Sequence, residues 1–162
     1  MKIAITGHSA GIGQALANLL ERRGHEIVGL SKRYGHNIHN IPKISQLIEP
    51  CDIFINNAQS HFAQTDLLFA VWRQWRGQDK KIVNISTEMV HMELAPREEW
   101  DEYLLQKKTL EEAHRMLSMR SELPILKMIR PGAIATQPGQ QPPEYQDVNE
   151  YATSIVGLID GP

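Results

Sequence analysis

The chain has 162 residues, of which 41% are hydrophobic and 22% are charged, and its formal net charge at pH 7 is -2. This length is enough for one well-packed core and too short for two full domains, so we expect a single domain over residues 1–162. The Lys and Arg residues are spread along the chain and produce no basic field, so we expect no nucleic-acid partner.

The apolar segments are short. No run approaches the roughly 18 residues of a membrane span, and the first residues lack the apolar stretch of a signal peptide. The single cysteine, Cys51, cannot form an internal disulfide and stands in an apolar run. We therefore expect a soluble cytoplasmic protein without a membrane partner, in which Cys51 is a buried, unreactive thiol.

The first thirty residues have the pattern of a strand, a turn, a helix and a second strand. Residues 2–6 are a short apolar β-rich run, residues 14–23 carry apolar side chains at helical spacing and end at Gly24, and residues 25–30 form the next apolar run. A βαβ unit of this size joins neighbouring parallel strands by a right-handed crossover. The sequence therefore predicts a parallel sheet.

The same alternation continues to the end of the chain, which is typical of an α/β fold. Residues 31–50 hold only a short helix and are too few for a helix, a strand and a further helix. The Pro- and Gln-rich loop at 131–143 is either a mobile loop or a lid over a site. Further strands are predicted over 52–56, 81–86 and 125–129, and helices over 43–48, 65–76, 98–120 and 148–159.

A glycine-rich turn, Thr6-Gly-His-Ser-Ala-Gly-Ile-Gly13, lies between the first strand and the first helix. Glycines allow the backbone to approach a pyrophosphate closely, and the helix N-terminus stabilises its charge. By itself the motif is equally compatible with an ordinary glycine-rich turn. The expected phosphate contacts come from Gly7, His8, Ser9, Gly11, Ile12 and Gly13.

Four more motifs follow in order, and together the five resemble the short-chain dehydrogenase/reductase superfamily. They are Asn56-Asn57-Ala58, Asn84-Ile85-Ser86-Thr87, Tyr103-x-x-x-Lys107 and the segment Arg130–Thr136. The resemblance implies a Rossmann-like doubly wound parallel sheet of about six strands, with the third shortened or absent and no seventh strand. It also implies cofactor contacts from Asn57, Ala58, Pro131, Gly132, Ile134 and Thr136.

Tyr103 and Lys107 are four residues apart on a predicted helix and therefore share a face. A nearby ammonium favours the phenolate, so we expect a Tyr103 pKa below the usual value of about 10. Tyr103 could then exchange a proton with a carbonyl or alcohol oxygen while hydride moves at the nicotinamide. The alternative is an exposed helix pair without a catalytic role.

The superfamily resemblance adds two further catalytic roles. It implies that Lys107 also hydrogen-bonds the nicotinamide ribose. It also places a hydroxyl just past the strand over 81–86 that steadies the reacting oxygen, which falls on Thr87 with Ser86 as the alternative. For Ser86 we favour the simpler interpretation of a hydroxyl at the end of a strand.

The second strand is followed by Ser31, Lys32 and Arg33, where a protein that prefers NAD would present an acidic residue. A hydroxyl and two cations suit a 2′-phosphate, so we expect NADP(H) in preference to NAD(H). The alternative is a solvated basic loop. By resemblance, Asn37 and Ile38 lie beside the adenine.

Several features depart from the superfamily pattern. Gln59 stands where the superfamily has a glycine, and no helix asparagine can be assigned to the proton relay, although Gln64 could approximate it. The seven histidines show no spacing typical of a metal site, so no metal is expected. Trp72, Trp75 and Trp100 are expected in core or subunit packing, since the resemblance implies a homodimer or homotetramer joined through their helices.

The resulting hypothesis is an NADP(H)-dependent oxidoreductase that interconverts a small-molecule carbonyl compound and an alcohol. Tyr103 would be the acid/base, Lys107 its electrostatic partner and Thr87 the hydroxyl that steadies the oxygen. The alternative hypothesis is a non-catalytic dinucleotide-binding regulator or interaction protein. An epimerase or dehydratase would need a larger substrate platform than the sequence offers.

Overall fold

The apolar runs of the sequence form a parallel β-sheet, as the computed structural model of residues 1–92 and 98–161 shows. Within these residues the main sheet has five strands in the order β2-β1-β3-β4-β5, and every pairing is parallel. The predicted Rossmann-like fold is therefore confirmed. The strands are β1 (Lys2–Thr6), β2 (Glu26–Leu30), β3 (Ile53–Asn56), β4 (Lys81–Ile85) and β5 (Ile125–Ile129).

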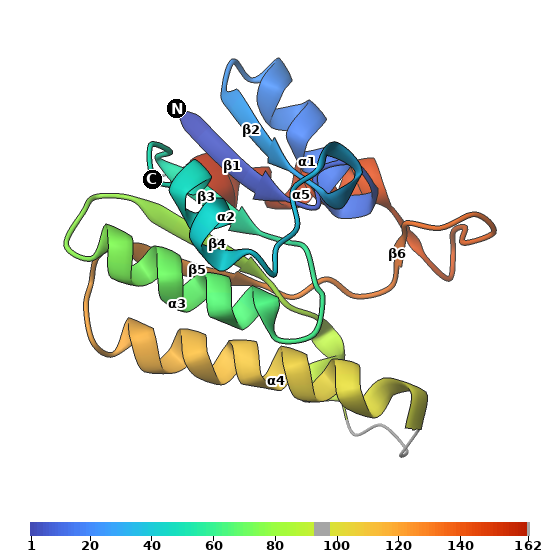
Figure 1. Ribbon diagram of the computed structural model, residues 1–162. Coiled ribbons are helices and arrows are strands. Elements are labelled where there is room, and N and C mark those ends of the chain that lie inside the picture. The colour runs from blue at the N-terminus through green and yellow to red at the C-terminus, as the bar shows by residue number, and fades with distance from the viewer. Residues whose placement is uncertain (93–97, 162) are drawn as a thin grey trace.

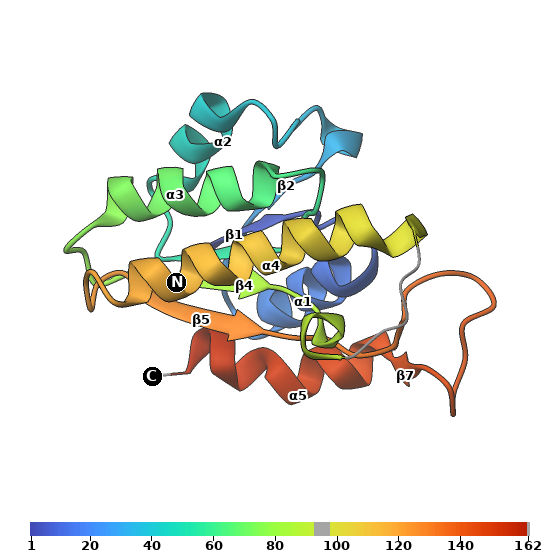
Figure 2. The same cartoon turned by 90° about the horizontal axis from the view of Figure 1, so that it is seen from below.

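Helices cover both faces of this sheet (Figures 1 and 2). One face carries α1 (Gly11–Arg22) and α5 (Val148–Asp160). The other carries α2 (Ile41–Ile48), α3 (Ala63–Trp75) and α4 (Glu98–Ser118). Because both faces are covered, the central strands β3 and β4 are buried along their whole length, which explains their continuous apolar sequence.

The link from β2 to β3 contains no strand. It consists of the short 3₁₀ helix η1 (Lys32–Tyr34) and α2, so the third strand of the superfamily pattern is absent, as expected. The predicted loop at 131–143 includes the two-residue strand β6 (Ile134–Ala135). That strand pairs with β7 (Gln146–Asp147) in a separate parallel ribbon and does not extend the main sheet.

Several element boundaries differ from the sequence prediction. The first helix begins at Gly11 rather than at residue 14, because it starts inside the glycine-rich turn. In α2, Asn40 caps the first turn by accepting a hydrogen bond from the Lys43 amide at 3.3 Å. Helix α3 begins at Ala63 instead of residue 65, and α4 ends at Ser118 instead of residue 120. Helix ends depend on these local contacts more than on apolar spacing.

The predicted core residues can now be located. Trp72 and Trp75 are buried in the core beneath α2, α3 and α4, whereas Trp100 is 39% exposed. Cys51 is buried, and burial raises the pKa of its thiol to about 11, which agrees with an unreactive side chain. Within the described residues, no helix is both long and apolar enough to cross a membrane.

Parallel strands all end at the same edge of the sheet, so the residues after β1, β2, β3, β4 and β5 meet there. The direction in which successive strands are added to the sheet reverses between β1 and β3, because β2 lies on one side of β1 and the later strands lie on the other. Ligands of open α/β sheets bind at this point, beyond the carboxyl ends of the strands. Four of the five sequence motifs begin at or run into this edge, and the fifth, Tyr103-x-x-x-Lys107, lies on α4.

Candidate active site

The glycine-rich turn after β1 is packed so closely against the rest of the chain that it has no room for side chains at Gly7 and Gly13. Gly7 and Gly11 have positive φ values of 71° and 54°, which side chains other than glycine rarely adopt. A Cβ atom on Gly13 would lie 2.3 Å from the carbonyl oxygen of Gly7 and 2.6 Å from Nδ2 of Asn57. The turn is therefore a cradle of bare backbone at the start of α1, as a pyrophosphate requires.

The Asn56-Asn57-Ala58 motif holds the end of β1 beside this cradle. Oγ1 of Thr6 accepts hydrogen bonds from the backbone amides of Asn57 and Ala58, both at 3.0 Å. The Asn57 side chain donates to the Thr6 carbonyl at 2.9 Å. The backbone and side-chain amides of Asn57 thus join the end of β1 to the end of β3.

Three buried polar atoms in the turn after β1 and in the segment after β2 have no hydrogen-bond partner among the described residues. These atoms are Oγ of Ser31, Nδ1 of His8 and Nδ1 of His36. The His8 ring stacks on Tyr34 with 5.4 Å between centroids, and it fits against β2 because residue 29 is a glycine. Unpartnered buried polar atoms are rare in proteins, so this end of the sheet fits a polar ligand such as a nucleotide.

The residues that the sequence assigned to the adenosine end lie in different environments. Lys32 and Arg33 are exposed on η1, next to the buried Ser31. Asn37 is exposed and accepts a hydrogen bond from the His39 amide at 3.0 Å. Ile38 is packed in the core on the α2 side of the sheet, so its side chain contributes to stability.

A cavity of about 250 Å³ lies between the glycine turn, the end of β4 and α4. It brings together residues from all five sequence motifs. Gln59, which departs from the superfamily pattern, also lines it. The lining consists of Ile12, Asn57, Gln59, Ile85, Ser86, Thr87, Tyr103, Lys107, Pro131, Gly132, Ile134 and Thr136.

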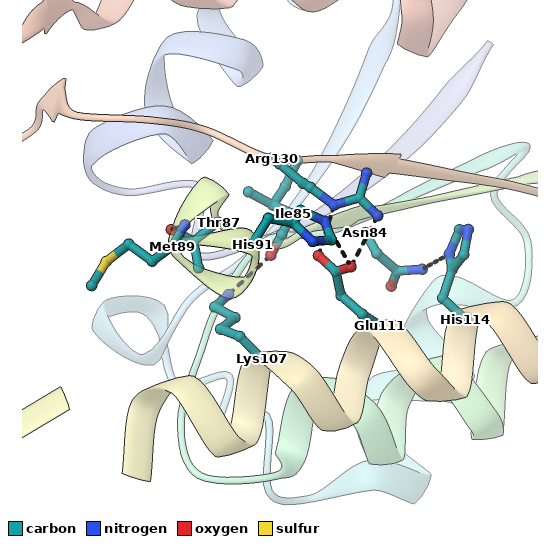
Figure 3. A network of polar contacts seen from close by, with 9 residues as sticks. All are labelled: Asn84, Ile85, Thr87, Met89, His91, Lys107, Glu111, His114 and Arg130. Carbon is teal, nitrogen blue, oxygen red and sulfur yellow. Dashed lines mark hydrogen bonds and ion pairs between the residues drawn. The ribbon is translucent and has the colours of Figure 1, made fainter. Parts of the chain in front are cut away.

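Lys107 is buried in the wall of this cavity. Its Nζ donates hydrogen bonds to the Ile85 carbonyl at 2.9 Å, as Figure 3 shows, and to Oε1 of Gln64 at 3.0 Å. Burial lowers the pKa of Lys107 to about 8, and the Glu111 carboxylate opposes this shift. The ammonium of Lys107 lies 5.7 Å from the centre of the Tyr103 ring.

The ionisation of Tyr103 differs from the sequence prediction. Burial raises its pKa, and the Thr87 hydroxyl only partly offsets that effect. The expected lowering of the Tyr103 pKa is wrong for this structure, because burial penalises the phenolate more than the neighbouring groups favour it. Tyr103 is therefore a neutral phenol near pH 7, which is the form that can donate a proton.

Gln64 is the most important residue that sequence reasoning left unassigned. It is buried on α3, where its Nε2 donates to the carbonyl oxygens of Asn56 at 2.6 Å and Ile85 at 2.9 Å. Its Oε1 accepts from Lys107. No spacing in the sequence connects residue 64 with residue 107, so only the packing of α3 against α4 reveals the pair.

An ion pair fastens the segment after β5 to α4. Nε and one terminal nitrogen of Arg130 contact the two oxygens of Glu111, both at 2.9 Å, and His91 lies 3.7 Å from the same carboxylate (Figure 3). Burial opposes ionisation of Glu111, but the hydrogen bonds and the positive charge of Arg130 outweigh it and lower the pKa of the carboxyl group. Glu111 follows Lys107 by four residues, so helical spacing could have identified it.

Buried amides connect the strand ends beneath the cavity. Nδ2 of Asn56 donates to Oδ1 of Asn84 at 2.9 Å, and Nδ2 of Asn84 lies 3.1 Å from Nδ1 of His114. Figure 3 shows the Asn84–His114 contact between the sheet and α4. Buried polar contacts of this kind hold strands and helix in one relative position.

The parallel sheet and its glycine cradle at the strand ends define a Rossmann domain of the dinucleotide-binding class. The profile of the NAD dependent epimerase/dehydratase family matches residues 3–104. The chain belongs to this family. The predicted kinship with short-chain dehydrogenases/reductases is confirmed.

Solved structures with the same fold include several dehydrogenases and reductases. An alcohol dehydrogenase from the archaeon Thermococcus sibiricus, complexed with 5-hydroxy-NADP, has a TM-score of 0.79 at 18% sequence identity. The alignment covers 100% of this chain and 92% of the alcohol dehydrogenase. A short-chain dehydrogenase from Burkholderia cenocepacia in complex with NADP has a TM-score of 0.74 at 16% sequence identity. The alignment covers 99% of this chain and 84% of the dehydrogenase. These likenesses establish the fold.

A third similar structure is bound to the other form of the cofactor. The 3-ketoacyl-(acyl-carrier-protein) reductase from Brucella melitensis, complexed with NADH, has a TM-score of 0.75 at 14% sequence identity. The alignment covers 99% of this chain and 90% of the reductase. The fold thus accommodates both dinucleotides. A search of curated protein sequences finds no significant match.

Proposed function

We propose that this protein is an NADP(H)-dependent oxidoreductase that interconverts a small-molecule carbonyl compound and an alcohol. The observation that carries this proposal is the cavity in which Thr87, Tyr103 and Lys107 meet beside the glycine turn. When bound, the dinucleotide supplies or accepts the hydride at its nicotinamide ring. The bare backbone at Gly7 and Gly13 and the unpartnered Ser31 hydroxyl are suited to hold it.

In this proposal the chain's own residues manage the proton and the charge. In reduction, the neutral Tyr103 gives its proton to the carbonyl oxygen as hydride reaches the carbonyl carbon, and in oxidation Tyr103 takes that proton back. The Thr87 hydroxyl donates a hydrogen bond to the same oxygen. The buried ammonium of Lys107 stabilises the phenolate that remains after proton transfer.

The preference for NADP(H) rests on the end of β2. Ser31 lies there beside two cationic residues, Lys32 and Arg33, and no acidic residue stands at 31–35 to bond a free ribose hydroxyl. The preference is tested by thermal unfolding with NADPH or NADH at equal concentration, because the tighter ligand raises the melting temperature more. A larger rise with NADH would refute it.

The chemistry is tested with Tyr103→Phe, which removes only the proton donor. We expect carbonyl-dependent NADPH oxidation to fall by about 10²- to 10⁴-fold, while the dissociation constant for NADPH stays the same. Tyr145→Phe, the same change outside the cavity lining, is the matched control. Unchanged turnover in Tyr103→Phe would refute the catalytic assignment.

A second candidate function is a non-catalytic dinucleotide-binding regulator. One observation favours it: the ammonium of Lys107 is already engaged by Gln64 and the Ile85 carbonyl. A panel of aldehydes, ketones and alcohols distinguishes the two functions. NADPH binding without turnover on any member of the panel would establish the second candidate, and turnover on any of them would exclude it.

A homodimer or homotetramer in the cytoplasm is also part of the proposal. The layer formed by α3 and α4 leaves large apolar side chains in contact with solvent, including Phe62, Leu105 and Met116. Such side chains are suited to bury against a second copy. Light scattering after size-exclusion chromatography measures the mass, and a monomer at micromolar concentration would contradict this part of the proposal.

A further inference from the structure

Gln59 occupies a position in the cavity wall that its own contacts define. It follows the Asn56-Asn57-Ala58 motif and lines the same cavity as Tyr103 and Lys107. Its side-chain nitrogen donates a hydrogen bond to Oε1 of Gln106, which is buried on α4. Nε2 of Gln106 in turn donates to Oε1 of Glu102 at 2.9 Å.

This chain of hydrogen bonds has a direction. A carboxylate such as Glu102 only accepts hydrogen bonds, so Gln106 must turn its nitrogen toward Glu102 and its oxygen toward Gln59. Gln59 must then present its nitrogen to Gln106. The amide oxygen of Gln59 is left over, and among the described residues no donor pairs with it.

Most other polar groups of the cavity have partners or roles already. The Asn57 amide donates to Thr6, and Lys107 donates to Gln64 and Ile85. The Ser86 hydroxyl has no hydrogen-bond partner among the described residues, but its oxygen is buried. In the proposed reaction Thr87 and Tyr103 serve the reacting oxygen. A hydroxyl elsewhere on a bound molecule would therefore find an accessible acceptor at the exposed Gln59, because the Ser86 oxygen is buried.

We infer that the amide oxygen of Gln59 accepts a hydrogen bond from a hydroxyl group of a molecule bound in this cavity. The inference rests on the proposed function, which provides two possible sources of that hydroxyl. One is the nicotinamide ribose of the cofactor. The other is a substrate hydroxyl on the carbon next to the reacting carbonyl.

The experiment uses the full chain and three variants. Gln59→Met keeps the length of the side chain and removes its hydrogen bonds, whereas Gln59→Glu keeps oxygen acceptors. Gln46→Met makes the same Gln-to-Met substitution on the exposed face of α2 and is the control. Because Gln59 is exposed, neither substitution there should prevent folding.

Two measurements distinguish the sources. In the first, calorimetry gives the dissociation constant for NADPH without substrate. In the second, kcat/KM is compared for 3-hydroxy-2-butanone and 2-butanone, which differ by one hydroxyl. Loss of one neutral hydrogen bond should weaken the affected quantity about 3- to 10-fold in Gln59→Met, with Gln46→Met unchanged.

A weaker NADPH affinity identifies the ribose hydroxyl, and a lost preference for 3-hydroxy-2-butanone identifies the substrate hydroxyl. The inference is overturned if Gln59→Met changes neither quantity, or if Gln59→Glu is as impaired as Gln59→Met. Failure of the wild type to bind NADPH or NADH would instead overturn the proposed function.

Discussion

The two ends of the candidate site are built in different ways. At the glycine turn, the site is shaped by backbone that has room for no side chain, as Gly7 and Gly13 show. At the catalytic end, it is shaped by buried polar side chains that bond one another, with Lys107 held by Gln64 and the Ile85 carbonyl. The glycine turn therefore depends on the absence of side chains, and the catalytic end depends on hydrogen bonds between buried side chains.

This difference has a practical consequence. Substitutions at the glycine turn should act by steric overlap and should be most severe where a Cβ atom would meet backbone. Substitutions at the catalytic end should act by leaving buried polar atoms without partners, and their cost should depend on burial. The following predictions test this contrast, beginning with the largest expected effect.

The first prediction concerns Gly13→Ala. A methyl group here would lie 2.3 Å from the Gly7 carbonyl oxygen, so we expect a loss of about 3 kcal/mol in the free energy of unfolding and loss of NADPH-induced thermal stabilisation. Gly157→Ala is the matched control, because a Cβ there meets nothing within 4 Å. In helix α5 it should stabilise by up to about 1 kcal/mol. Equal stability of the two variants in urea unfolding would contradict the steric explanation.

The second prediction concerns Gln64→Leu at the catalytic end. The substitution leaves the carbonyl oxygen of Asn56 without the Gln64 donor and Lys107 without one of its two acceptors. We expect urea unfolding to show a loss of about 2 kcal/mol. Gln46→Leu, on the exposed surface of α2, should change stability by less than about 0.5 kcal/mol. A neutral effect of Gln64→Leu would show that the polar contacts do not stabilise the catalytic end.

The third prediction concerns the pH dependence of stability. Burial lowers the pKa of Lys107 to about 8, below its value in the unfolded chain. Between these two values the unfolded state binds more protons than the folded state, so the free energy of unfolding rises with pH. The burial cost is fully present below pH 8, and about 1 kcal/mol of it should disappear between pH 8 and pH 9.

The Lys107→Met variant isolates this effect. Cys51 has a raised pKa in the folded state and works in the opposite direction, but it is present in both proteins. The difference in unfolding free energy between wild type and Lys107→Met should therefore change with pH from 8 to 9. A constant difference would mean that Lys107 titrates at its ordinary pKa.

The smallest predicted effect compares two arginine–glutamate pairs whose glutamates lie on α4. Arg130→Ala removes two charge-assisted hydrogen bonds to Glu111, whose side chain is only 15% exposed, and should cost about 1 kcal/mol. Arg115→Ala removes an exposed pair with Glu112 and should cause no measurable change in thermal unfolding. Equal effects of the two substitutions would show that burial does not determine the strength of these pairs.

Much of the fold was predictable because it depends on local patterns. The strand over residues 125–129 was predicted with its observed bounds, and α5 was predicted to within one residue at its end. The alternation of apolar strands and helices indicated a parallel sheet, since parallel neighbours need a crossover connection, which is usually a helix. The third strand was absent, as the short link between β2 and β3 indicated.

The candidate site was predictable in part. The glycine turn, Thr87, Tyr103 and Lys107 could be identified because each is part of a motif with fixed spacing, and the structure gathers them at one cavity. The pKa of Tyr103 could not be predicted, because it depends on burial and on what else the Lys107 ammonium contacts. Gln64 and Gln106 belong to no motif.

By itself, the sequence determined the order of strands and helices, the glycine turn and the residue types available for chemistry, because these follow from local periodicity and spacing. The tertiary structure alone decided which of those side chains meet, how deeply Lys107 and Tyr103 are buried, and which way the amide of Gln59 faces. Those properties depend on contacts between residues that are far apart in the chain, such as Gln64 and Lys107. They are set only when the helices pack on the sheet.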